Sequence, residues 1–431
     1  MNRGFYTVMA AQFFSSLADN ALLIAAIALL VQLQGPAWMT PLLKFFFTVS
    51  YVVLAAFVGA FADSMPKGKV MFITNTVKII GCALMFFYDQ FALLGIGPHM
   101  VVLTSYAVVG LGAAAYSPAK YGILTEMLPP RQLVIANGWI EGLTVASIII
   151  GTMLGGALIN PRVSALLLSI DVPHIDTGID TPPEAAILVI SLFYLVAAAF
   201  NLRIPDTGAR YHQQSRNPLT MVGDFVTCFS TLWRDKLGQI SLAVTTLFWG
   251  AGATLQFIVL RWAERRLEMP LSQGAILQGI VALGVALGAV LAGRLVPLKK
   301  SLNVLPVGVA MGLAVMSLMF VTWMPLVYFL LILVGALAGF FVVPMNALLQ
   351  HRGHVLLSAG HSIAVQNFNE NLNILLMLAL YALMIRANFA INTIITLFGV
   401  FVCLTMLLVI RRHKHNQLKE DSLHLIGIEK R

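Results

Sequence analysis

The stretch YTVMAAQFFSSLADNALLIAAIALLVQL, residues 6–33, is long and apolar enough to cross a membrane as a single helix. Asp19 is its one charged residue, and it lies about 20 Å along a helix that crosses an apolar layer about 30 Å thick. A carboxylate at that depth is costly against lipid, so it should face a polar cavity or a partner. We predict that Asp19 and its neighbour Asn20 belong to a functional site; the alternative is a structural acid paired with a neighbouring helix.

The rest of the chain has the same apolar character. It has 431 residues, of which 59% are hydrophobic and 10% are charged, whereas soluble domains have roughly 45–50% apolar residues. This composition predicts an all-α integral membrane protein. Twelve stretches can span the membrane, six on each side of a polar gap, at residues 6–33, 41–62, 70–88, 99–119, 133–158, 185–202, 238–260, 272–293, 302–323, 326–349, 360–385 and 389–410.

The positions of lysine and arginine predict the orientation. When the amino terminus is placed in the cytoplasm, most of the 27 basic residues fall in cytoplasmic loops or in the tail from Arg411 onward. The positive-inside rule therefore predicts that both chain termini are cytoplasmic. The net charge of +9 reflects this topology and does not indicate a nucleic-acid partner.

The polar gap, residues 204–236, divides the chain into two parts. An N-terminal six-helix half covers residues 1–203, a C-terminal half covers residues 237–411, and a cytoplasmic tail covers residues 412–431. Within this cytoplasmic linker, residues 219–233 have the pattern of a helix that lies on the inner membrane surface. The outward segment 160–184, rich in acidic residues and proline, is predicted to be an exposed loop without an assigned role.

A weak internal repeat supports the division into halves. Pro118 and Lys120 in the fourth span match Pro344 and Asn346 in the tenth, because both pairs have the same separation in sequence. The match relates one span to the span six further along the chain. Such repeats are parallel and are related by an axis along the membrane normal, as in major facilitator transporters.

The inner loop between the second and third spans contains Asp63, Lys67 and Lys69 around a predicted tight turn. It resembles the loop motif of the major facilitator superfamily. A glycine, Gly59 or Gly68, would permit the turn, and the Asp63 carboxylate can hold a neighbouring helix end in one state and release it in another. We predict a conformational gate at these residues; the alternative is a solvated turn.

Polar side chains inside other spans are further candidates. Lys120 either binds substrate or extends to the membrane surface. Glu141 is either a cavity acid or a packing partner, and Lys78 could pair with Glu141 or with Asp19. Span eleven has amides around one acid, which is very costly without water or ligand; the residues are Gln366, Asn367, Asn369, Glu370, Asn371 and Asn373.

Missing motifs exclude several functions. The pair Gly68-Lys69 lacks the earlier glycine that a phosphate-binding loop needs, so ATP-driven transport by this polypeptide is not expected. The usual histidine and aspartate signature of acyltransferases is absent, and the three cysteines are scattered. No catalytic residue, cofactor or metal is predicted. The clustered histidines are interpreted as inner-face loop residues: His351, His354 and His361.

Several short blocks carry a resemblance to a known family. They are QFFS and DNAL within residues 12–22, SPAKYGIL at 117–124, ANG at 136–138, FWGAG at 248–252, FFVVP at 340–344, NALLQ at 346–350, and AVQN with EN within 364–371. These blocks, spread over both halves, resemble the bacterial lysophospholipid transporter family of the major facilitator superfamily. The resemblance implies facilitated flipping of lysophosphatidylethanolamine and related lysolipids from the periplasmic to the cytoplasmic leaflet of the inner membrane, where a partner acyltransferase restores the missing chain.

The head group of such a lipid has a phosphate and an ammonium, so its site needs a base, an acid and amides. Asp19 or Glu370 can meet the ammonium, and Lys120 the phosphate. The predicted substrate-binding set is Asp19, Asn20, Lys120, Tyr121, Gln256, Asn346, Gln366, Asn367 and Glu370, with Lys78 and Glu141 as secondary intramembrane charges. Gln256 is a departure, because the resemblance implies a basic residue there; this shifts the phosphate role to Lys120.

The sequence therefore predicts a monomeric, twelve-span major facilitator protein with alternating access between its halves. A rival hypothesis is a proton-coupled exporter of amphipathic small molecules, in which Asp19, Glu141 or Glu370 exchanges protons. A lipid-modifying membrane enzyme is a third hypothesis. The absence of a nucleophile, base and orienting group argues against it.

Overall fold

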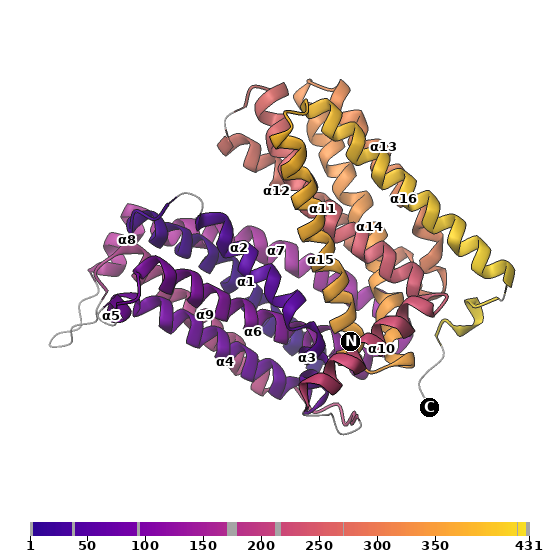
Figure 1. Ribbon diagram of the computed structural model, residues 1–431, viewed down its shortest axis with the longest axis horizontal. Helices are drawn as coiled ribbons and strands as arrows, with labels where there is room; N and C mark the ends of the chain where they lie inside the picture. The colour runs from indigo at the N-terminus through magenta and orange to yellow at the C-terminus, as the bar shows by residue number, and fades with distance from the viewer. Residues whose placement is uncertain are drawn as a thin grey trace. The chain divides into compact units, whose positions relative to one another are not determined.

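The computed structural model describes residues 3–36, 39–92, 95–169, 179–211, 217–269, 271–419 and 421–427. Within these ranges the regular structure is helical and contains no strand (Figure 1). Among the described residues, eleven helices are long and apolar enough to cross a membrane, and the number is twelve when a bent helix pair is counted as one span. The prediction of an all-α protein with twelve transmembrane helices is confirmed.

The first six spans are α1 (Arg3–Gln32), the pair α2 (Met39–Val53) and α3 (Ala55–Asp63), α4 (Lys67–Phe86), α6 (Pro98–Met127), α7 (Leu133–Ile159) and α9 (Pro182–Leu202). The pair α2 and α3 is bent by 65°. The last six are α11 (Gly238–Arg266), α12 (Leu271–Leu295), α13 (Leu305–Ser317), α14 (Met324–Leu356), α15 (Ala359–Arg386) and α16 (Ile391–Lys419).

Three short 3-10 helices belong to the spans: η1 (Pro130–Gln132) precedes α7, and η2 (Leu298–Val304) and η3 (Leu318–Phe320) flank α13, so that the ninth candidate span is Leu298–Phe320. The other short helices lie outside the spans and are α5 (Tyr88–Ala92), α8 (Pro161–Leu168), α10 (Pro218–Arg234) and η4 (Leu423–Leu425). Helix α10 confirms the helix expected at residues 219–233, and Phe225 and Phe229 pack edge-on against Phe368 of α15.

The sequence predicted that the segment 160–184 is a loop, but the structure contains α8 in this segment and the start of α9 at its end. Asn160 accepts a hydrogen bond from the Arg162 backbone N–H at 3.0 Å and so begins α8. At the other end, the Glu184 side chain accepts the Thr181 backbone N–H at 2.9 Å, which completes a capping box and begins α9 at Pro182. These capping residues outweigh the loop-like composition. The part of the segment at 170–178 lies outside the described residues.

Proline lies inside α6 at Pro118 and inside α14 at Pro344, at matching points of the fourth and tenth spans. Both helices continue past their predicted ends at residues 119 and 349, to Met127 and Leu356. The predicted ends were too early because the apolar pattern stops before the helix does. The polar residues in these last turns are therefore part of a helix, which fixes the direction of their side chains.

The chain forms two compact units. Unit 1 contains residues 1–123 and 146–215, and unit 2 contains residues 124–145 and 216–431. The predicted boundaries at 203 and 237 follow the order of the chain, whereas the units follow contacts. The two divisions therefore differ at residues 124–145, and the predicted linker is divided between the units after residue 215. Helix α7 consequently has its first half in unit 2 and its second half in unit 1.

Each unit has its own tightly packed helix pairs. In unit 1, α9 packs against α1 and α4 around a core that includes Leu22, Met85 and Tyr194. In unit 2, α12 packs along α14, α11 along α15 and α13 along α16. Figure 1 shows α10–α12 of this unit in rose to salmon and α13–α16 in orange to yellow.

Helices α12 and α14 touch at their backbones. A Cβ atom at Gly339 would collide with the Val285 carbonyl oxygen, and one at Gly335 with the Val281 carbonyl oxygen. Gly284 and Gly288 make the reciprocal approach from α12. Small residues at a spacing of four allow this contact between membrane helices. The first half of α14 is thereby fixed against α12.

Candidate functional site

The Asp19 carboxylate is part of a polar cluster within unit 1. Lys78 Nζ of α4 donates to Asp19 Oδ1 at 2.9 Å and to Oδ2 at 2.8 Å, and the Tyr194 hydroxyl of α9 donates to Oδ1 at 2.6 Å. Lys78 Nζ also donates to Ser15 Oγ at 3.0 Å, and Ser15 donates to Asn75 Oδ1 at 2.8 Å. Of the two partners that the sequence left open for Lys78, the structure selects Asp19.

The surroundings of Lys78 explain how a charged side chain is held at this depth. Gly112 of α6 lies against its stem, because a Cβ there would be 2.8 Å from Lys78 Cγ. The rings of Tyr116 and Tyr194 have their centroids 5.1 and 5.6 Å from Nζ, within the range of cation–π attraction. The Lys78 side chain is 2% exposed and that of Asp19 is 18% exposed. The ammonium is enclosed, whereas one side of the carboxylate remains accessible.

The other predicted residues of unit 1 have contacts outside this cluster. Asn20 donates to the Ser16 carbonyl oxygen of its own helix at 2.8 Å. Lys120 Nζ lies 4.2 Å from the centroid of the Tyr121 ring, and both side chains are half-buried on α6. These contacts neither join Lys120 to Asp19 nor assign it a ligand, so the predicted roles of Asn20, Lys120 and Tyr121 stay predictions.

The junction between α3 and α4 contains a buried ion pair. Lys67 Nζ lies 2.6 Å from Asp63 Oδ1, donates to the Ala62 carbonyl oxygen at 2.8 Å, and lies 4.8 Å from the centroid of the Tyr211 ring. Lys69 is exposed. The predicted gate residues thus separate into a buried pair, Asp63 and Lys67, and an exposed base.

The glycine expected to form the turn does not do so. Gly59 lies within α3 and Gly68 within α4, and the turn between the helices consists of Ser64, Met65 and Pro66. Gly68 instead lets α4 approach the end of α9, because a Cβ there would be 3.2 Å from the Asn201 carbonyl oxygen. Proline supplies the turn geometry, and the glycine permits close packing.

The segment that follows α9 is shaped by a surface ion pair. Arg210 Nη2 lies 2.7 Å from Asp206 Oδ2, and the Gly208 backbone N–H donates to Asp206 Oδ1 at 2.9 Å. These two contacts, Arg210 first, lower the pKa of the Asp206 carboxyl to about 2. The pair therefore stays ionised throughout the neutral range and does not act as a pH sensor there.

Unit 2 contains a chain of buried amides and carboxylates. Asn346 of α14 donates through Nδ2 to Glu141 Oε1 of α7 at 3.2 Å. Gln366 of α15 donates through Nε2 to Asn346 Oδ1 at 3.0 Å and to Glu370 Oε1 at 2.7 Å. The structure thus brings together four residues that the sequence had marked in three separate spans. All four are buried.

A second contact between α7 and α14 was missed by the sequence analysis. Asn137 Nδ2 donates to Gln350 Oε1 at 2.9 Å, and Gln350 Nε2 donates back to Asn137 Oδ1 at 2.9 Å. We call these two side chains the amide pair. Asn137 precedes Glu141 by four residues and Gln350 follows Asn346 by four, so the two contacts lie one turn apart on antiparallel helices. The sequence did contain a signal for this contact, because each of these neutral amides lies one helical turn from a residue already named as a candidate.

The sequence suggested that the polar residues of span eleven form a single polar centre. In the structure they contact different neighbours instead. Asn369 Oδ1 accepts the Trp233 Nε1–H of α10 at 3.2 Å, and Asn373 donates to the Thr246 carbonyl oxygen of α11 at 2.8 Å. Asn371 donates to the Asn367 carbonyl oxygen of its own helix at 2.9 Å. A helix presents residues in all directions, so consecutive amides reach different neighbours. Gln366 and Glu370 share a face because they are four residues apart.

Gln256, predicted to bind substrate, is exposed on α11 and bonded to α12. Its Nε2 donates to Gln278 Oε1 at 3.1 Å, and Gln278 Nε2 donates to the Gln256 carbonyl oxygen at 2.9 Å. The contact joins two neighbouring helices. A substrate role for Gln256 stays a prediction.

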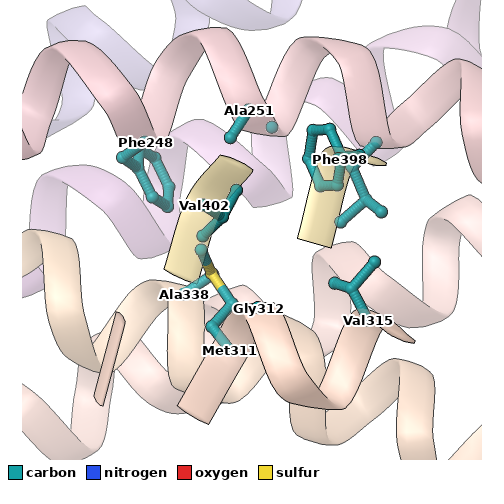
Figure 2. A pocket seen from close by; sticks show the side chains of 10 residues that line it. Phe248, Ala251, Met311, Gly312, Val315, Ala338, Phe398 and Val402 are labelled. Atoms are coloured by element: carbon teal, nitrogen blue, oxygen red, sulfur yellow. The ribbon is translucent and has the colours of Figure 1, made fainter. Parts of the chain in front are cut away.

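A small apolar hollow lies among α11, α13, α14 and α16 of unit 2, and Figure 2 shows its side chains. It has a volume of about 30 Å³, which is room for about one water or methyl group. Its lining is Phe248, Ala251, Gly252, Leu255, Met311, Gly312, Val315, Ala338, Phe398 and Val402. The hollow is too small to hold a head group and offers it no polar partner.

Comparisons with known proteins agree with this architecture. The family model of the Major Facilitator Superfamily matches residues 8–372. A crystal structure of a bacterial homologue of the iron transporter ferroportin, in an outward-facing state, has a TM-score of 0.72 and 14% identity over 97% of this chain and 100% of that chain. The fucose:proton symporter FucP of E. coli has a TM-score of 0.72 and 14% identity over 95% and 98%. At this identity the similarity shows the fold alone, which is that of a multi-pass membrane transporter of the major facilitator class.

Closer relatives define the family more narrowly. The lysophospholipid transporter LplT of Yersinia enterocolitica is 41% identical over 389 residues, which are 90% of this chain and 88% of that protein. LplT of Yersinia pestis is 41% identical over 387 residues, with the same shares. The chain therefore belongs to the lysophospholipid transporter family of the major facilitator superfamily, as the sequence blocks had indicated. It is a transporter and not an enzyme.

Proposed function

We propose that this protein flips lysophospholipids, lysophosphatidylethanolamine among them, from the periplasmic to the cytoplasmic leaflet of the bacterial inner membrane. Both Yersinia relatives are named lysophospholipid transporters, which supports this substrate class. Transport is facilitated, proceeds by alternating access in a monomer with both termini in the cytoplasm, and supplies a lysophospholipid acyltransferase on that side of the membrane.

The observation that supports a head-group site is a buried hydrogen-bond acceptor of unit 2, Gln366 Oε1, that lacks a donor among the described residues. Gln366 uses Nε2 for Asn346 and Glu370, while its Oε1 is buried and has no hydrogen-bond partner among the described residues. A buried acceptor without a donor is unfavourable by roughly 1–3 kcal/mol. The ammonium of an ethanolamine head group has three N–H donors, so it can satisfy Gln366 Oε1 and the Glu370 carboxylate together.

The two candidate carboxylates for the ammonium are not equivalent. Asp19 already accepts two hydrogen bonds from Lys78 and one from Tyr194, so an ammonium would have to compete with an enclosed lysine. The Glu370 carboxylate accepts a hydrogen bond from Gln366, whose own Oε1 is buried and has no hydrogen-bond partner among the described residues. We therefore assign the ammonium to Glu370 and Gln366, and an accessory, hydrogen-bonding role to Asp19 and Asn20.

The remaining assignments follow from charge and position. Lys120, half-buried beside Tyr121, is the base for the phosphate. The amides of Asn346 and Asn367 are suited to the glycerol oxygens. Asp63 with Lys67 and Lys69 controls opening.

The test is uptake of fluorescent lysophosphatidylethanolamine into proteoliposomes, read with a leaflet-selective quencher. Glu370→Gln removes the charge and keeps the shape, so the initial rate should fall about 10- to 100-fold, as expected for loss of a charged hydrogen bond. Asn371→Ala is the matched control, because the Asn371 amide donates its hydrogen bond to the Asn367 carbonyl oxygen of its own helix. Normal uptake by Glu370→Gln would refute the assigned site.

Lys120→Ala should also reduce uptake, and Lys120→Arg should restore part of it, because Arg retains the positive charge that the phosphate needs. A second measurement separates this function from proton-coupled export. Collapsing the proton gradient leaves a facilitated flippase active, whereas a coupled exporter stops.

A further inference from the structure

Residues 421–427, which we call the tail strap, fold back against unit 2 beyond the end of α16 (Figure 1). In the last turns of α16, Gln417 Nε2 donates to Ser422 Oγ at 2.8 Å, and the Ser422 backbone N–H donates back to Gln417 Oε1 at 3.3 Å. Ile426 is 2% exposed, whereas Leu423 on the same strap is 44% exposed. Ile426 is thus the buried anchor of the strap.

The strap is attached to α14 through one histidine. The Gly427 backbone N–H donates to His351 Nε2 at 2.9 Å. A ring nitrogen that accepts a hydrogen bond has no proton, so His351 is neutral in this contact, with its proton on Nδ1. Gly427 has φ = +92°, a conformation that favours glycine. Its backbone geometry directs the N–H at the histidine.

His351 lies between two other anchored residues of α14. Gln350 forms the amide pair with Asn137 of α7, and Arg352 donates to Asp235 Oδ2 at 2.6 Å and to Oδ1 at 3.2 Å. Consecutive helical residues differ by about 100° in direction, so the three side chains reach three different neighbours. The inner end of α14 is therefore held by α7, by the tail strap, and by Asp235, the residue that ends α10.

We propose that the tail strap is a built-in clamp on the inner end of α14. While docked, it holds this end in the position in which Gln350 pairs with Asn137. When it is released, the end loses the His351 contact and the amide pair opens more often. The strap thereby adjusts how readily α7 and α14 separate, and this role does not depend on which lipid is carried.

Hydrogen exchange of the purified full chain tests the proposal. Ile426→Asp removes the buried anchor, and truncation after Lys419 removes the whole strap. Both should speed backbone exchange in residues 346–356 and 133–141 about tenfold, because local opening becomes easier. Leu423→Asp introduces the same charge at an exposed position of the strap and should leave exchange as in the wild type.

Substitutions at His351 test the attachment itself. His351→Phe removes the acceptor and should reproduce the truncation, whereas His351→Gln offers an oxygen acceptor and should restore slow exchange. Wild-type exchange in the truncated protein would overturn the proposal, even if Ile426→Asp fails to fold. Because exchange is measured without substrate, this result is separate from the failure of the proposed function, which Glu370→Gln uptake decides.

Discussion

Lys78 and Asp19 form a two-point ion pair in which one ammonium donates to both carboxylate oxygens, at 2.9 and 2.8 Å. The lysine is almost completely buried and the carboxylate largely so. Removing one charge of such a pair leaves the other in an apolar interior, which is far costlier than removing both. Loss of uptake in Asp19→Ala would therefore not by itself identify a substrate contact.

A double substitution separates the two roles of this pair. Lys78→Met should lower the free energy of unfolding by about 3–5 kcal/mol, because the Asp19 charge loses its enclosed partner. The double variant Asp19→Asn with Lys78→Met should recover most of this loss. Thermal unfolding in detergent measures both. A double variant no more stable than Lys78→Met would show that the pair does not act as a unit.

The two lysines at the start of α4 should behave differently. Lys67→Ala removes the ammonium 2.6 Å from the Asp63 carboxylate and should cost about 3–5 kcal/mol of stability. Lys69→Ala is the control, and a change within about 0.5 kcal/mol is expected because the side chain is exposed. Chemical denaturation compares them. Equal losses in the two variants would argue against a structural role for the buried pair.

The amide pair gives a prediction with its own internal comparison. Asn137→Leu should destabilise by about 1–3 kcal/mol, because Gln350 keeps a buried amide without its partner. Adding Gln350→Leu should remove that penalty, so the double variant is expected to be more stable than the single one. A double-mutant cycle in thermal unfolding measures the coupling. Additive losses would contradict the direct contact.

The backbone contact between α12 and α14 predicts a large effect of one methyl group. Gly339→Ala places Cβ against the Val285 carbonyl oxygen, so the helices must separate, and a loss of about 1–3 kcal/mol is expected. Gly279→Ala on α12 is the control, because a Cβ there meets no atom within 4 Å. It should be neutral or slightly stabilising. The ranking of the two melting temperatures decides the matter.

The fold could be predicted because each segment that crosses a membrane must be a helix and must be apolar over the same minimum length. Charges such as Asp19 were recognisable as candidates for the same reason, since a carboxylate is conspicuous in an apolar helix. The choice of Asp19 as the partner of Lys78 could not be predicted, because it depends on which helices pack side by side. The amide pair was missed because neutral Asn137 and Gln350 stand out less than acids do.

Local details failed where packing or capping outweighs composition. Gly68 is required by the contact between α4 and α9 and not by a turn, which only the neighbouring backbone at Asn201 reveals. The helix at 161–168 depends on a single capping side chain, Asn160. Span eleven looked like one polar centre because a linear sequence does not show which neighbour each amide faces.

Helix α14 has three consecutive sections that differ in how freely they can move. Gly335 and Gly339 fix its first section rigidly to α12, so that part cannot rotate alone. Pro344 then removes one backbone hydrogen bond, which makes the helix easiest to bend at that point. Beyond it, the polar contacts of Asn346, Gln350 and Arg352 help to set the direction of the final turns. Conformational change in this unit can therefore be confined to a short lever at one end of a single helix, while the remaining bundle stays still.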